Sequence, residues 1–189
     1  MTAEMYLPSF YVKQKLAMTT NRYELVAAEP GGGEGRLMGL AQQKRLAFKE
    51  EVTFYADGSK ARPVFSFKAR KRVDLNAGYD VLDEAQRQIG FFRKDFGASL
   101  LRSTFHVEGP GYTGTGQERS HLTALLRRVA DIPFLSIHFD FTTPDGAPLM
   151  SVERQFQLRD RYTVTVPDER VDFRVAAAIA VGLDALMQR

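Results

Sequence analysis

Hydrophobic and polar residues alternate with a period of two through most of the chain. This period places successive side chains on opposite faces of an extended strand. In the segment FLSIHFDF, the apolar residues at 135, 137, 139 and 141 share one face, and the polar residues between them share the other. The same pattern predicts strands at 51–55, 64–70, 103–108, 134–141, 150–159 and 161–166.

Turn-forming residues separate these strands. PGGG at 30–33, DGS at 57–59, GPG at 109–111 and PDG at 144–146 combine glycines, which accept left-handed backbone, with residues that favour tight turns. Short strands with frequent turns predict a mainly β domain.

Three hairpins share one pattern, in which an aromatic residue and an acid lead the first strand and basic residues end the second. The leading pairs are Tyr23-Glu24, Tyr79-Asp80 and Phe139-Asp140, and the return strands begin at Met38, Ile89 and Met150. Three similar hairpins predict one sheet built by repetition.

Two segments follow a helical period instead. The first, at 120–131, places Leu122, Leu125 and Leu126 on one stripe and is predicted to be an amphipathic surface helix. The second, VDFRVAAAIAVGLDALMQR, contains nine consecutive small or apolar residues at 175–183. A helix that is apolar all round must be buried on every side.

The second helix indicates the architecture. It is too short to cross a membrane, because Asp172, Arg174 and Asp184 interrupt the apolar run. In a chain of strands, the simplest way to surround it is a sheet rolled into a closed β-barrel of about twelve strands. The small residues of the helix suit a narrow bore, and Asp168 is predicted to cap its N-terminus.

Length and composition predict one domain spanning 1–189. The chain has 189 residues and ordinary proportions of apolar and charged residues, and cores rarely divide before about 250 residues. It contains no cysteine, which excludes disulfides, thiolate metal sites and cysteine nucleophiles. The N-terminal residues lack the pattern of a secretory signal. We therefore expect the protein to be cytoplasmic. Peripheral association with a membrane surface is the alternative location.

Four segments make the chain similar to a known family, the LURP-one-related and phospholipid scramblase branch of the tubby C-terminal-like group. They are YVKQKLAM, GLAQQKRLAFKEEVTFY, FKARKRVDLNAGYDVLDEAQRQIGFFRK and VAAAIAVGLDAL. This resemblance implies a twelve-stranded barrel around a central hydrophobic helix. It also implies a function at lipids, since relatives include phosphoinositide-binding domains and proteins linked to lipid movement.

Positive charge is concentrated in one part of the chain. Residues 36–72 carry a net charge of +7, whereas the whole chain carries +3. Lys and Arg bind phosphate groups through charge-assisted hydrogen bonds. The concentration of positive charge therefore predicts a binding site for anionic headgroups in this region. The alternative is a solvated strand face that Lys and Arg protect from edge-to-edge pairing. The candidate ligand-binding residues are Lys44, Arg45, Lys68, Arg70, Lys71 and Arg72.

Other chemistries find no support in the sequence. His106, His121 and His138 lack the spacing of metal ligands, and no nucleotide-binding or nucleophile motif occurs. We predict no catalytic residues, metal or cofactor, and therefore a non-enzymatic binding module for anionic phospholipid or a peripheral membrane surface. The alternative function is a structural or regulatory domain that binds a protein partner. Nucleic acid is disfavoured because aromatic residues do not interleave the basic cluster.

One charged residue breaks the inward apolar pattern. Arg154 follows Met150 and Val152 on the face predicted to point inward, so we expect either a β-bulge or a paired carboxylate there.

Overall fold

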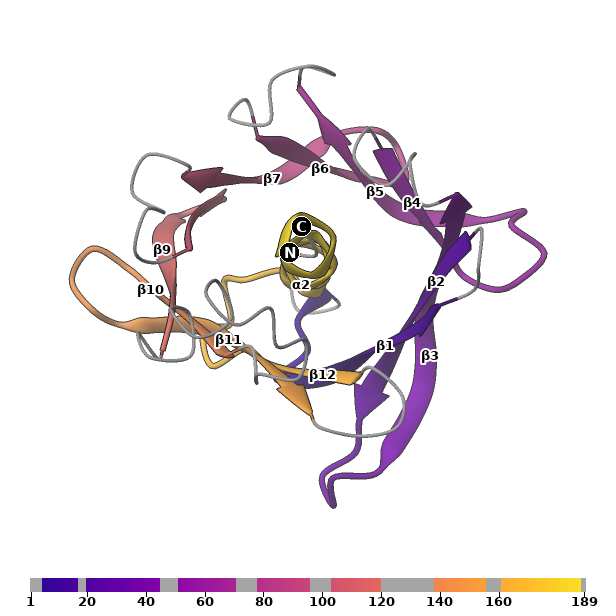
Figure 1. The fold of residues 1–189 in the computed structure, drawn as a ribbon, viewed down its shortest axis with the longest axis horizontal. Coiled ribbons are helices and arrows are strands. Elements are labelled where there is room, and N and C mark those ends of the chain that lie inside the picture. The colour runs from indigo at the N-terminus through magenta and orange to yellow at the C-terminus, as the bar shows by residue number, and fades with distance from the viewer. Residues whose placement is uncertain are drawn as a thin grey trace, which may run out of the picture.

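The computed structural model describes residues 5–16, 20–44, 51–70, 78–95, 103–119, 138–155 and 161–187. Twelve antiparallel strands form a closed barrel, and the helix α2 runs through its centre (Figure 1). The predicted fold class is therefore confirmed. The predicted amphipathic helix at 120–131 lies outside the described residues.

The strands follow one another around the wall in chain order, and β12 pairs with β1 to close it. Their bounds are β1 Ser9–Leu16, β2 Thr20–Ala28, β3 Glu34–Lys44, β4 Glu51–Tyr55, β5 Pro63–Ala69, β6 Tyr79–Asp83, β7 Gln88–Asp95, β8 Thr104–Gly109, β9 Tyr112–Glu118, β10 His138–Thr142, β11 Pro148–Gln155 and β12 Arg161–Thr165. The six predicted strands each coincide with one of these within the described residues.

Tight turns occupy one end of the barrel. The four predicted turns connect β2 to β3, β4 to β5, β8 to β9 and β10 to β11. Gly32, Gly111 and Gly146 in these turns adopt positive φ angles of 81°, 78° and 87°, which a side chain would disfavour. We call this end the turn end, and the opposite end of the wall the far end.

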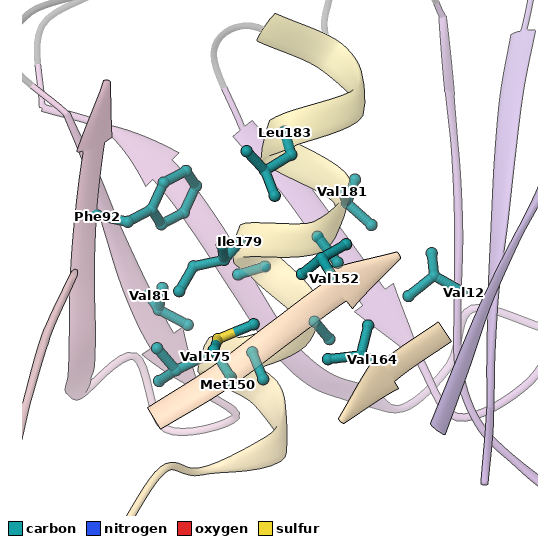
Figure 2. Close-up of a cluster of buried hydrophobic side chains, with 14 of the residues drawn as sticks. Val12, Val81, Phe92, Met150, Val152, Val164, Val175, Ile179, Val181 and Leu183 are labelled. Carbon is teal, nitrogen blue, oxygen red and sulfur yellow. The ribbon is translucent and has the colours of Figure 1, made fainter. Parts of the chain in front are cut away.

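The helix α2, Phe173–Met187, begins at the turn end and fills the bore. Residues 175–181 are completely buried. Figure 2 shows Val175, Ile179 and Leu183 of the helix packed among side chains from several strands, including Val81, Phe92 and Val152. The all-round apolar surface in the sequence is thus explained, because strands face the helix on every side.

The bore is narrow enough to require small residues. A Cβ atom on Gly182 would lie 2.6 Å from Cε2 of Phe92, closer than packed carbon atoms approach. A Cβ atom on Gly90 of β7 would lie 2.7 Å from Cγ2 of Val175. The predicted fit between small helix residues and a narrow barrel is confirmed.

The predicted N-cap was wrong. The helix begins at Phe173, and Asp172 caps it, because its carboxylate accepts a hydrogen bond from the Arg174 amide at 2.9 Å. Asp168 instead closes a separate turn, in which its carboxylate accepts from the Arg170 amide at 3.0 Å. Four residues of non-helical chain therefore separate Asp168 from the helix, a spacing that the acidic run alone did not reveal.

The repeat detected in the sequence corresponds to a threefold repetition in space. The three hairpins are β2–β3, β6–β7 and β10–β11, so their leading strands lie four strands apart around the wall. Each leading aromatic residue is buried. Each following acid pairs on the outer surface with a base at the end of the preceding strand, through Lys15–Glu24 (3.1 Å), Arg70–Asp80 (2.7 Å) and Arg119–Asp140 (2.7 Å).

Candidate anion-binding site

The barrel brings two distant parts of the basic segment to the same place. β3 and β5 both run toward the far end, and only β4 lies between them (Figure 1). Neighbouring strands are about 4.8 Å apart, so the ends of β3 and β5 are separated by roughly 10 Å. β3 ends at Lys44, and β5 ends one residue after Lys68.

Lys68 lies on the outer face with its side chain 59% exposed. Its strand neighbours are both acids, Glu51 on β4 and Asp80 on β6. The Lys68 ammonium is 3.9 Å from the Glu51 carboxylate, which is beyond hydrogen-bonding distance. Lys68 is thus accessible to an anion and held only weakly by its neighbours.

Arg70 is held more firmly. Two guanidinium nitrogens, Nε and Nη2, donate to Oδ1 of Asp80 at 2.9 and 2.7 Å, and these bonds raise the pKa of the guanidinium. The guanidinium carbon also lies 4.0 Å from the centre of the Phe91 ring. Equivalent ion pairs occur in the other two repeats, so the Arg70–Asp80 pair is a recurring contact of the wall.

The rest of the predicted cluster is less defined. Arg45, Lys71 and Arg72 lie outside the described residues, and of Lys44 only the backbone is described. The structure therefore brings together the two strand ends that carry the cluster. Lys68 is exposed and weakly paired at the end of β5, whereas Arg70 is hydrogen-bonded to Asp80.

A second cationic region was missed by sequence reasoning. Arg36 on β3 and Arg62 before β5 line a groove of about 330 Å³ near the turn end. Both belong to the basic segment 36–72 but stand apart from its runs of Lys and Arg. The local net charge was the only signal in the sequence that included them.

A buried polar cluster lies inside the barrel near the far end. The Asp184 carboxylate of α2 accepts hydrogen bonds from Gln14 Nε2 at 2.6 Å and from the Tyr162 hydroxyl at 2.5 Å. The Tyr23 hydroxyl donates to the same carboxylate. Burial, followed by the charge of Asp184, raises the pKa of Tyr23, so Tyr23 remains a donor. This cluster fastens the helix to the wall.

Arg154 is resolved as an inward-facing residue near this cluster. The ladder between β11 and β12 is continuous from Ser151 to Gln155, which excludes a bulge at Arg154. Its guanidinium carbon lies 5.9 Å from the centre of the Tyr162 ring, within range of a cation–π contact.

The described residues contain neither a cluster of three His, Asp or Glu side chains placed to hold a metal ion nor a helix long and apolar enough to cross a membrane. His106 and His138 lie on different strands, each near an aspartate, at 3.3 Å from Asp95 and 3.5 Å from Asp140.

Comparison with known proteins identifies the family. A search of the curated proteins found no match. The crystal structure of a "putative lipoprotein" from Parabacteroides distasonis is similar over 84% of this chain and 94% of that one, with 9% identity and a TM-score of 0.24, too low to support an argument about fold or function. The model of the LURP-one-related family matches residues 39–184, from β3 to near the end of α2. The chain belongs to the LURP-one-related family.

Proposed function

We propose that this protein is a non-enzymatic module that binds anionic phospholipid headgroups at a membrane surface, through the basic residues at the far ends of β3 and β5. The observation that carries the proposal is the shared direction of these two strands, which brings the chain at Lys44 and the chain at Lys68 within roughly 10 Å of each other.

Two further observations support it. Lys68 is exposed and makes no hydrogen bond to Glu51, so it can donate to a phosphate without losing a strong internal contact. The segments that follow Lys44 and Arg70 in the chain contain Arg45, Lys71 and Arg72. Basic residues near an anionic surface each contribute about 1 kcal/mol to binding. The filled bore supports a binding role on the outer surface over a central catalytic cavity.

The test is co-sedimentation with vesicles that contain phosphatidylserine or a phosphoinositide, over a series of salt concentrations. The informative variant is K68A/K71A/R72A, which leaves the structural pair Arg70–Asp80 intact. A matched control, K13A/K60A/R87A, removes three positive charges from other parts of the surface. We expect salt-sensitive binding that the first variant loses and the control retains.

If the native chain does not sediment with anionic vesicles at low salt, the proposal is wrong. Equal losses in both variants would indicate a general charge effect without a site. Absence of vesicle binding would favour the alternative, a domain that binds a protein partner, to be sought by affinity capture.

A further inference from the structure

The groove that contains Arg36 and Arg62 combines free positive charge with an exposed apolar surface. Its lining residues come from β3, the turn between β4 and β5 and the start of β5, together with Met5 and Glu84. Its volume of about 330 Å³ is at the small end of the range for small-molecule sites, roughly 300–1,000 Å³.

The two arginines differ from others on this surface. Arg70, Arg119 and Arg170 each donate to an aspartate at 2.7 Å or less. Arg36 and Arg62 are both exposed, and neither guanidinium forms an ion pair or hydrogen bond with any side chain in the described part of the chain.

The acids near the groove are already engaged. Asp57 accepts hydrogen bonds from the Ser59 hydroxyl at 2.6 Å and the Ser59 amide at 2.9 Å. These bonds are the main reason that its pKa is lowered, and the charge of Arg62 adds a smaller contribution. Glu84 is 3.2 Å from the Arg174 guanidinium. Both arginines therefore retain the capacity to bind an anion, and a guanidinium can do so through two parallel donors.

An apolar surface lies directly beside these charges. Leu37, the residue after Arg36, is 43% exposed, unusual for a large hydrophobic side chain in the described residues. Met38, Met5 and Val64 are half-buried and pack against the core. Methionine side chains adapt to irregular apolar partners. The groove is thus lined by two arginines and, beside them, by a short apolar surface.

We propose that this groove binds a single-chain amphiphile with an anionic head, such as a medium-chain fatty acid. Arg36 and Arg62 hold the head, and the chain covers Leu37 and Met38. The site is independent of the proposed headgroup site, because Pro63 and Lys68 lie at opposite ends of β5, roughly 17 Å apart at 3.3 Å per residue.

The experiment uses the full chain labelled with ¹³C in the methionine methyl groups. Decanoate, well below its micelle concentration, is titrated while the methyl signals are followed by NMR. We expect saturable shifts at Met5 and Met38, which line the groove, and none at Met150, which is buried in the core. R36Q/R62Q is expected to weaken binding at least tenfold, and L37N severalfold.

The control variant K15Q/R87Q removes two charges outside the groove and should bind decanoate as the native chain does; the side chains of Lys15 and Arg87 are 46% and 75% exposed. Folding of each variant is checked from the unchanged Met150 signal. Equal affinity in R36Q/R62Q and the native chain would overturn the proposal.

Two further probes separate the roles of head and chain. If acetate shifts Met5 and Met38 as strongly as decanoate does, the groove binds an adventitious anion and the proposal fails. If the non-ionic octyl maltoside binds as tightly as decanoate, the arginines have no role and it fails again. Vesicle sedimentation of R36Q/R62Q should equal that of the native chain. A loss there would mean that the groove faces a bilayer, which contradicts a single-chain ligand.

Discussion

The two ends of α2 hold charge in different ways. Near the far end, Asp184 is 1% exposed and accepts hydrogen bonds from the neutral side chains of Tyr23, Tyr162 and Gln14. At the turn end, the Arg174 guanidinium donates to Asp172 at 2.7 Å and lies 3.2 Å from Glu84, whose side chain is 54% exposed.

The difference lies in access to water. Glu84 can be hydrated if its partner is lost, so the Arg174–Glu84 pair resembles a surface contact. Asp172 is only 12% exposed but also accepts a hydrogen bond from the Arg174 amide. The donors to Asp184 come from β1, β2 and β12, the strands at which the barrel closes. A buried carboxylate without such donors is very costly. The far end is therefore where one substitution should disturb both the helix and the closure of the wall.

Removal of the Asp184 carboxylate should have the largest effect. D184A leaves two tyrosine hydroxyls and an amide buried without their acceptor, and we expect a loss of about 3–5 kcal/mol in the free energy of unfolding. Urea denaturation followed by circular dichroism measures it. D184N keeps one acceptor oxygen and should lose less. If D184A lowers the free energy of unfolding by less than about 1 kcal/mol, the cluster contributes little to holding the helix in the barrel.

Alkaline pH should weaken the same end. The pKa of Tyr23 is raised above its ordinary value of 10.0 by burial and by Asp184. Above pH 10 the unfolded chain releases this proton while the folded chain retains it, so stability is full below pH 10 and falls above it. The expected slope from this group is about 1.4 kcal/mol per pH unit.

Stability curves between pH 9.5 and 11.5 for the native chain and Y23F test this expectation. The slope, rather than the absolute stability, is the relevant quantity, because Y23F also removes a hydrogen bond at neutral pH. Identical slopes in the two proteins would contradict the expected ionisation.

Loss of the ion pairs at the turn end should cost less. R174A removes the contacts to Asp172 and Glu84, and we expect a decrease of about 1–2 kcal/mol, since water can replace the guanidinium at Glu84. Asp172 still caps the helix through the amide at position 174. If R174A lowers the free energy of unfolding as much as D184A does, the two ends of the helix do not differ in the way proposed.

The smallest effect is expected at Tyr112, also at the turn end. Its hydroxyl is buried and has no hydrogen-bond partner among the described residues. Y112F removes a polar group that gains little from folding, so we expect a change of less than about 1 kcal/mol, in the stabilising direction. Thermal unfolding compared with the native chain measures it. A clear destabilisation would indicate that the hydroxyl does contribute to the fold.

Much of the architecture could be predicted because it depends on local pattern. The alternation at 51–55 predicted β4 at its observed bounds, and the turn residues predicted four of the tight connections. The apolar run at 175–183 predicted a helix surrounded by strands. In each case, the side chains of one segment reveal which of its faces are buried, independently of which segment lies opposite.

The candidate sites were predicted less completely, because they depend on which residues become neighbours. The sequence could not show that Arg70 has an acidic partner, because only the strand register places Asp80 within its reach. Arg36 and Arg62 share a groove only because β3 passes the turn between β4 and β5.

The amino-acid pattern was enough to predict strands, turns, the buried helix and the concentration of positive charge. Which charges are neutralised, where the helix starts and how Asp184 is hydrogen-bonded became known from the folded barrel. Periodicity is a property of one segment, whereas an ion pair or a hydrogen bond needs a partner whose position is set by strand register and barrel closure.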